Sequence, residues 1–305
     1  MISDLDMRLW SSSVTLGPGV SDALRRRANS SLDTVEIHEE RLARAIAVVD
    51  RAFLLGFRSL LLASSIPNDY VSNVARRYPD KVLPVAGIDP MDPAWADDLD
   101  RARALGHVAI TVSPSLQGYA PGHSRAMRLW ERCAEARIPV IVSRVGPLPS
   151  QALLEFERPL LWDEPLRHLP TLTLVFGGLG APFFEETLVL LAKHARTFAH
   201  LAGAARRPLD AYRWLSAALD AGVADRLLFA SGFPFDTPSA AIERLFTLNT
   251  VVHGTTLPGI PRRDIEAIVR RDVFAALGIA DPIAARPMGD KEALLAAARS
   301  LLSDR

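Results

Sequence analysis

Short apolar segments alternate with amphipathic segments along the whole chain, and this alternation constrains the fold more than any other feature. Strands separated by helical segments are typical of βα units in a parallel sheet. Eight such pairs predict a (β/α)8 TIM barrel; a doubly wound sheet is the alternative, because periodicity alone does not show closure. The expected strands are Ser3–Leu9, Arg58–Ala63, Val82–Ile88, Val108–Val112, Pro139–Ser143, Thr171–Phe176, Thr197–Leu201 and Leu227–Ala230. The expected helices lie near Glu39–Leu55, Asp69–Arg77, Pro93–Leu105, Ser124–Ala136, Leu160–His168, Pro182–Lys193, Leu209–Ala221 and Pro238–Leu248.

Two further amphipathic segments, Arg262–Leu277 and Lys291–Leu302, follow the eighth pair. We expect them to be helices that pack on the outside of the barrel. A chain of 305 residues can bury the core of one large barrel or of two ordinary domains. No linker or repeat divides it. The sequence therefore predicts one domain over residues 1–305, with the barrel in about 1–250 and the C-terminal helices in about 261–305.

The charge and cysteine content exclude several classes of protein. The 35 Lys and Arg residues balance the 35 Asp and Glu residues, so neither nucleic acid nor an anionic membrane is expected as a partner. Cys133 is the only cysteine, which excludes an internal disulfide and a Cys-based zinc site. The N-terminus lacks the pattern of a signal peptide, and Arg58 interrupts the most apolar segment, Ala52–Ile66. We expect a cytoplasmic protein.

Several motifs at the ends of predicted strands resemble those of one family. Leu228–Phe235 reads LFASGFPF and resembles the last barrel strand of the amidohydrolase superfamily, in its amidohydrolase-related, decarboxylase-like branch. That strand usually reads close to LFGSDYP. Gly87–Pro90 (GIDP) resembles the end of the third strand, Pro114–Tyr119 (PSLQGY) the fourth loop, and Gly178–Pro182 (GLGAP) the sixth. The order and spacing of these pieces carry the resemblance, which implies a TIM barrel.

The resemblance also implies a metal-dependent hydrolase or decarboxylase, but the ligand positions depart from the family's pattern. The family holds a divalent metal with an H-x-H pair on the first strand and with His and Asp on later strands. Here the corresponding positions are Asp6, Arg8, Ser143, Gly178 and Gly232. Arginine stays protonated and offers no lone pair to a metal, and glycine has no side chain. We therefore expect no metal site of the family type and no cofactor.

Four residues remain as candidates for chemistry: Asp6, Arg8, Arg144 and His200. Residues two apart on a regular strand point to the same side, so Asp6 and Arg8 are expected to face the barrel interior together. Two interpretations stay open: the two form an ion pair that fills the old metal site, or Arg8 and Arg144 clamp a carboxylate or phosphate. His200 ends a predicted strand, where it is either a base or a hydrogen-bonded structural residue.

Two functions follow from these departures. The first is a non-catalytic barrel that serves as the partner subunit of an active amidohydrolase-like protein or as a ligand-binding pseudoenzyme. It would form a homo-oligomer, or a heteromer with a metal-complete paralogue, and would bind a small anionic ligand. The alternative is a metal-independent hydrolase or carbon–carbon lyase that acts on a small carboxylate and uses Asp6, Arg8, Arg144 and His200.

Overall fold

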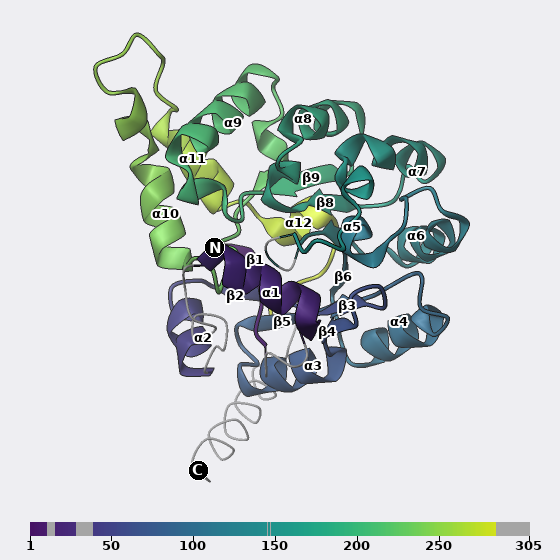
Figure 1. The fold of residues 1–305 in the computed structure, drawn as a ribbon. Helices are drawn as coiled ribbons and strands as arrows, with labels where there is room; N and C mark the ends of the chain where they lie inside the picture. Colours follow the sequence, from purple (N-terminus) through teal and green to yellow (C-terminus); the bar gives the residue numbers. More distant parts are fainter. Residues whose placement is uncertain (11–15, 29–38, 145, 147, 285–305) are drawn as a thin grey trace.

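Eight parallel strands close into a barrel. The computed structural model describes residues 1–10, 16–28, 39–144, 146 and 148–284. The sheet has the strand order β1-β2-β5-β6-β7-β8-β9-β10 (Figure 1). It closes through bonds from Leu5 N to Phe229 O (3.3 Å) and from Gly232 N to Asp6 O (3.1 Å). The predicted TIM barrel is confirmed. The strands are β1 (Ser3–Met7), β2 (Arg51–Leu55), β5 (Val82–Gly87), β6 (Ala109–Val112), β7 (Val140–Val142), β8 (Leu174–Phe176), β9 (Thr197–His200) and β10 (Leu227–Leu228).

Helices cover the outside of the barrel. In α6 (Ser124–Ala136), Ala126, Leu129, Trp130 and Cys133 recur at helical spacing and are buried against the sheet. Among the described residues, no helix is both long and apolar enough to cross a membrane. The other α-helices are α1 (Gly17–Ala28), α2 (Glu39–Ile46), α3 (Asn68–Arg77), α4 (Trp95–Ala104), α5 (Pro114–Gln117), α7 (Asp163–His168), α8 (Phe184–Lys193), α9 (Pro208–Asp220), α10 (Pro238–Phe246), α11 (Arg262–Val269) and α12 (Val273–Leu277). The 3-10 helices are η2 (Leu154–Glu157), η3 (Pro159–Trp162), η4 (Gly177–Gly180), η5 (Ala204–Arg206), η6 (Ala224–Arg226) and η7 (Leu248–Val252).

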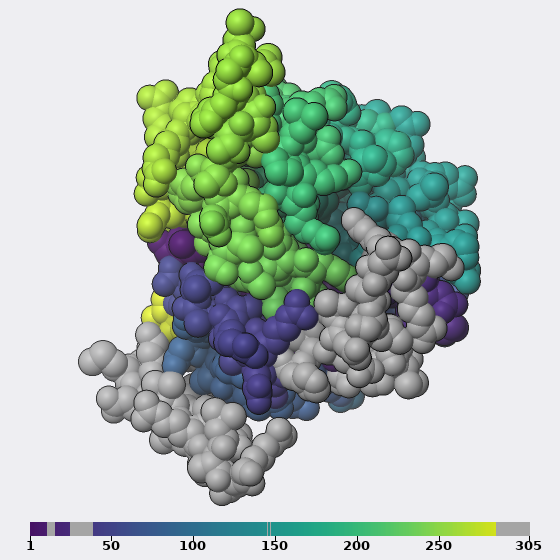
Figure 2. Space-filling view, turned by 60° about the vertical axis from the view of Figure 1, so that its left-hand side comes forward, coloured from purple at the N-terminus to yellow at the C-terminus, as the bar shows by residue number. Residues whose placement is uncertain are grey.

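The ring of helices closes where α2 meets α10. The two are far apart in the sequence but lie side by side in both views (Figures 1 and 2). From α2, Arg41 reaches across and donates a hydrogen bond from Nη2 to the carbonyl of Pro234 at 3.1 Å. Its guanidinium also lies 5.9 Å from the centre of the Phe233 ring. The segment that follows β10 is thus held from outside the barrel as well as by β1.

The second barrel strand was placed wrongly by the sequence analysis. The strand is Arg51–Leu55, inside the segment expected to be helical, while the expected strand at Arg58–Ala63 begins as β3 (Phe57–Ser59) of an antiparallel hairpin with β4 (Ser64–Ile66). Helix α2 ends at Ile46 because the chain turns there. Lys81 stabilises this turn by donating from Nζ to the carbonyls of Ile46 (3.0 Å), Ala47 and Val49.

Strand β1 carries an irregularity that decides where its side chains point. Its register against β2 shifts between Asp4 and Met7. Leu5 packs in the apolar cluster to which all eight barrel strands contribute, whereas Met7 packs with residues of the helices outside. A regular strand would point these two side chains, two residues apart, to the same side, so their opposite surroundings fit a β-bulge. The bulge aims both Asp6 and Arg8 at the mouth of the barrel.

The floor of the barrel is closed by α12, which corrects the expectation that the C-terminal helices only pack outside. Val273, Phe274 and Leu277 belong to the same interior cluster as Leu5. The carbonyl of Leu277 accepts a hydrogen bond from Arg196, which immediately precedes β9. Because this contact lies at the amino end of the strand, α12 seals the barrel opposite its mouth. The expected helix Lys291–Leu302 lies outside the described residues.

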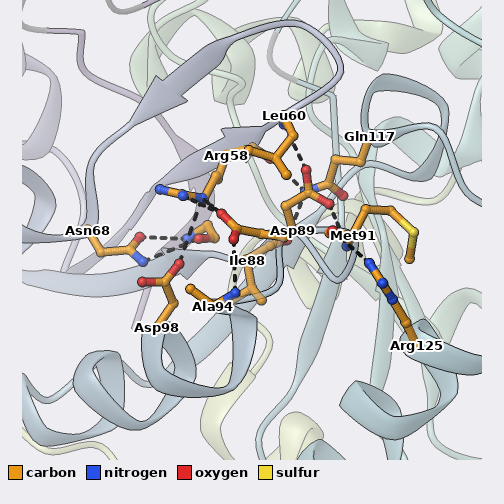
Figure 3. Close-up of polar contacts among 12 residues, drawn as sticks. Arg58, Leu60, Asn68, Ile88, Asp89, Met91, Ala94, Asp98, Gln117 and Arg125 are labelled. Atoms are coloured by element: carbon orange, nitrogen blue, oxygen red, sulfur yellow. Dashed lines mark hydrogen bonds and ion pairs between the residues drawn. The ribbon is translucent and has the colours of Figure 1, made fainter.

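Polar side chains tie three loops of the mouth together (Figure 3). Asp89 accepts a hydrogen bond from the backbone N–H of Leu60 at 2.9 Å. Gln117 donates from Nε2 to the carbonyls of Arg58 (2.7 Å) and Ile88 (2.8 Å). These contacts connect the β3–β4 hairpin with the loops after β5 and β6. The GIDP motif and the glutamine of the PSLQGY motif thus hold the rim in place.

Candidate functional site

A cavity of about 240 Å³ opens at the carboxyl ends of the strands, where the active sites of TIM barrels lie. Residues from the ends of β1, β7, β8, β9 and β10 line it. All five positions that the resemblance assigns to metal ligands are among them, together with the candidate Arg144. These lining residues are Asp6, Arg8, Ser143, Arg144, Gly178 and Gly232.

The bottom of the cavity is a buried ion pair. The Asp6 carboxylate pairs with the Arg8 guanidinium and accepts a hydrogen bond from the Ser143 hydroxyl at 2.6 Å. The Asp6 and Arg8 side chains are only 4% and 5% exposed. Burial lowers the pKa of Arg8, while the neighbouring Asp6 acts in the opposite sense. The expected pairing of Asp6 with Arg8 is present, and the two charges neutralise each other inside the protein.

His200 ends β9 and lies behind Asp6, with no exposed surface. Its Nε2 is 3.4 Å from Asp6 Oδ2. Its Nδ1 accepts the backbone N–H groups of Gly178 (3.4 Å) and Ala202 (3.3 Å), which requires an unprotonated Nδ1 and places the ring proton on Nε2. Burial lowers the pKa of His200 to about 4; Asp6 opposes this and Arg8 adds to it. The imidazole is therefore neutral at pH 7.

Arg144 follows β7 and is held by two protein groups. Its Nε lies 3.0 Å from Glu157 Oε1, and its Nη2 donates to the carbonyl of Ala181 at 2.9 Å. Glu157 also accepts a hydrogen bond from the Ser115 hydroxyl. Burial raises the pKa of Glu157, and the Arg144 guanidinium counteracts it. Glu157 was not a candidate from the sequence, because nothing in the residues around it indicates that it folds back onto Arg144.

Two glycines, Gly178 after β8 and Gly232 after β10, line the cavity with backbone only. Gly178 has φ +57° and Gly232 has φ +79°, in the left-handed region that favours glycine. A Cβ at Gly232 would lie 3.4 Å from the Cβ of Ala202, and one at Gly178 would lie 3.2 Å from the Ala202 carbonyl oxygen. The ends of β8 and β10 thus offer backbone to the cavity where the resemblance places metal ligands.

Asp4 lies at the seam between β1 and β10. It is fully buried, and its Oδ1 accepts the backbone N–H groups of Ser231 (3.0 Å) and Asp6 (3.2 Å). Its Oδ2 has no hydrogen-bond partner among the described residues. Burial raises the pKa of Asp4 to about 7, although the bonds from Ser231 and Asp6 lower it. This carboxyl secures the closure of the barrel and does not line the cavity.

These residues do not fit a divalent metal ion. Within the described parts of the chain, no three His, Cys, Asp or Glu side chains come together as a ligand group. At the mouth, Asp6 already shares its oxygens between Arg8 and Ser143, and a cation there would meet the charge of Arg8. His200 uses Nδ1 to accept backbone N–H groups. The donor set that tetrahedral or octahedral coordination needs is lacking in this part of the structure.

A basic and aromatic rim completes the cavity. Arg206 ends η5 and Arg207 follows it, just beyond β9. Arg207 lies over the Trp214 ring at 5.4 Å, and Trp214 and Phe235 supply apolar lining. None of these four residues was a candidate from the sequence. The basic pair shortly after a predicted strand is a signal that could have identified Arg206 and Arg207.

The family model described as Amidohydrolase matches residues 62–270, more than half of the chain. The chain belongs to the amidohydrolase family. The match begins after β1 and β2, so it does not include the first strand of this amidohydrolase-like barrel, with Asp6 and Arg8. A search of curated proteins found no match.

Solved structures share the fold of this amidohydrolase-family member at low sequence identity. An uncharacterized TIM-barrel protein of Bordetella bronchiseptica superposes with a TM-score of 0.68 and 22% identity, over 91% of this chain and 99% of that one. A 5-carboxyvanillate decarboxylase of Novosphingobium aromaticivorans, complexed with manganese and a nitrobenzoic acid, superposes with a TM-score of 0.66 and 14% identity, over 92% of this chain and 96% of that one. A probable 2-pyrone-4,6-dicarboxylic acid hydrolase of Acinetobacter baumannii with citric acid bound superposes with a TM-score of 0.59 and 13% identity, over 91% of this chain and 99% of that one.

Proposed function

We propose that this barrel binds a small carboxylate at its mouth. The observation that carries the proposal is the cavity lining, which holds the guanidinium groups of Arg8, Arg144, Arg206 and Arg207 and one acid, Asp6. Two further acids, Glu157 and Asp210, pair with Arg144 and Arg207 from outside the lining. Arginine binds carboxylates through paired N–H donors, and a partly enclosed cavity strengthens such contacts by excluding water. Two of the similar structures are named for carboxylic acids or hold one. This supports a carboxylate over other anions.

We propose further that binding needs no divalent metal, which makes the chain a ligand-binding pseudoenzyme within its family. The guanidinium of Arg8 neutralises Asp6 at the bottom of the cavity, so that carboxylate needs no metal cation to balance its charge. Thermal melting of the purified protein with and without benzoate, phthalate and 2,6-dihydroxybenzoate, in a chelator, tests this. We expect at least one carboxylate to raise the melting temperature, because a ligand of the native state stabilises it. A shift that appears only when manganese is added would refute the metal-independent function.

A second candidate function is a metal-independent hydrolase or lyase. The observation in its favour is the 3.4 Å contact between Asp6 and the neutral His200, which pairs a carboxylate that lines the cavity with a second proton-carrying group. Incubation with 2,6-dihydroxybenzoate in a chelator, followed by chromatography for resorcinol and carbon dioxide, tests carbon–carbon lyase activity. Turnover by the unaltered protein that is lost in His200→Ala would favour the enzyme over the pseudoenzyme.

We also propose that the chain acts beside a second subunit, either another copy or a metal-complete paralogue. The support is indirect: a barrel without a fitting metal site retains the family's frame. Size-exclusion chromatography with light scattering measures the homo-oligomer. Co-expression with an encoded paralogue that carries the H-x-H pair, followed by affinity purification, tests the heteromer. A strictly monomeric protein that purifies without the paralogue would overturn the subunit role and leave ligand binding intact.

A further inference from the structure

The four arginines of the mouth cavity are not equally free to bind an anion. Three of them already have an acidic partner: Arg8 pairs with Asp6, Arg144 with Glu157 at 3.0 Å, and Arg207 with Asp210 at 3.3 Å. Arg206 forms no ion pair with any residue that the structure describes, and it is exposed at the rim. The uncompensated positive charge of the cavity therefore lies at Arg206, away from the bottom.

We propose that Arg206, assisted by Arg207, binds the carboxylate of the ligand at the rim, and that the uncharged end of the ligand points down toward Ser143. This assignment rests on the proposed carboxylate-binding function. It names the residues that determine specificity, and it replaces the clamp of Arg8 and Arg144 that the sequence suggested. It also sets the class of ligand: a monoanion with an uncharged body.

The bottom of the cavity disfavours a second anion. A carboxylate placed against Arg8 would also face Asp6, whose charge Arg8 already neutralises. Two carboxylates around one buried guanidinium leave one negative charge unpaired in a site with little water, which is costly. The Ser143 hydroxyl is committed to Asp6 as a donor. An uncharged group meets none of these penalties.

The rim offers the complementary surroundings. Gly203, at φ +72°, turns the chain out of β9 into η5, which carries Arg206. Arg207 is fixed beside it by Asp210 and by the face of Trp214 at 5.4 Å. Trp214 and Phe235 line the same cavity with apolar surface. A carboxylate at the two guanidinium groups therefore leaves the body of the ligand in contact with aromatic side chains.

Isothermal titration with benzoate and with its uncharged analogue benzamide tests the assignment. Arg206→Gln is expected to weaken benzoate binding about tenfold, the effect of losing one charged hydrogen bond, without changing the affinity for benzamide. Arg263→Gln removes the same charge at a site that is 87% exposed and outside the cavity, and it should leave both affinities unchanged. Because Arg206 is exposed, benzoate binding should weaken from 50 to 500 mM NaCl.

Each outcome decides between the rim and the bottom. Benzoate affinity that is unchanged in Arg206→Gln but lost in folded Arg144→Gln would place the anion deeper in the cavity and overturn the assignment, while carboxylate binding would stand. Salt-independent binding would also contradict a solvent-exposed anion. Failure of the unaltered protein to bind benzoate or any other carboxylate would overturn the proposed function itself, and the rim assignment with it. Circular dichroism checks that each variant is folded.

Discussion

Arg8→Met tests the central feature of the site, the buried ion pair. Methionine keeps much of the apolar length of arginine but removes its charge, so the Asp6 carboxylate stays buried with only the Ser143 hydroxyl and His200 near it. Removal of one partner from a buried ion pair costs about 3–5 kcal/mol. Because the hydrogen bond from Ser143 remains, we expect the lower end, about 3 kcal/mol.

Urea unfolding at pH 7.5, followed by circular dichroism, gives the loss in free energy of unfolding. Arg101→Met is the matched control, since Arg101 pairs with Asp69 on the surface, where the side chains are 68% and 54% exposed. Exposed pairs contribute at most about 1 kcal/mol. The double variant Asp6→Asn with Arg8→Met should recover most of the loss, because no buried charge remains. If Arg8→Met costs no more than Arg101→Met, or if the double variant is no better than the single one, our account of the ion pair is wrong.

Three further predictions follow from buried groups and close contacts. Burial lowers the pKa of His200 from its ordinary value of about 6.5 to about 4, so the fold favours the neutral imidazole. The free energy of unfolding is therefore highest above pH 6.5 and should fall by up to about 3 kcal/mol as the pH is lowered toward 4. His200→Asn, which keeps an acceptor for the N–H groups of Gly178 and Ala202, should flatten the melting temperature between pH 6.5 and 4; an unchanged pH profile would contradict this. The pKa of Asp4 is raised to about 7, so its ionised form destabilises the fold at higher pH. Asp4→Asn should therefore stabilise the protein above pH 7 by up to about 4 kcal/mol. If the difference in unfolding free energy between variant and wild type is the same at pH 5 and pH 8, the raised pKa is refuted. In Gly87→Ala the new Cβ would lie 2.3 Å from the backbone nitrogen of Phe57, so the variant should lose several kcal/mol of unfolding free energy or fail to fold. Gly106→Ala is the control: its Cβ meets open space, and its φ of +83° should cost only about 1 kcal/mol.

The fold was largely predictable, because the eight βα pairs produce a regular alternation of apolar and amphipathic segments in the sequence. The position of β2 was not predictable. The residues before it continue the apolar spacing of α2, and the turn that separates them is stabilised by Lys81, which lies far along the chain. No local pattern shows that contact. Amphipathic α6, whose buried face is encoded at helical spacing, was predicted with its observed ends, Ser124 and Ala136.

The bottom of the site was predictable because Asp6 and Arg8 belong to one short strand segment. Their partners were harder to predict: Ser143 and His200 reach Asp6 only because the barrel closes. Glu157 reaches Arg144 from η2, a short 3-10 helix in the long connection after β7, and the conformation of such connections is set by tertiary contacts that a single sequence does not display. The sequence left open whether Arg8 and Arg144 clamp an anion, because it indicated the acid that pairs with Arg8, which is Asp6, but not the acid that pairs with Arg144, which is Glu157.

The α12 plug places a constraint on synthesis. A nascent chain that has emerged as far as residue 250 contains every barrel strand, yet the interior cluster still lacks Val273, Phe274 and Leu277. Strand β1 must also wait for β10, since the two pair across the closure. The hydrophobic core therefore cannot be completed before residue 277 has been synthesised. Until then Phe53, whose ring lies 6.0 Å from that of Phe274 in the folded protein, lacks this cover, and exposed apolar surface of this kind promotes aggregation of folding intermediates.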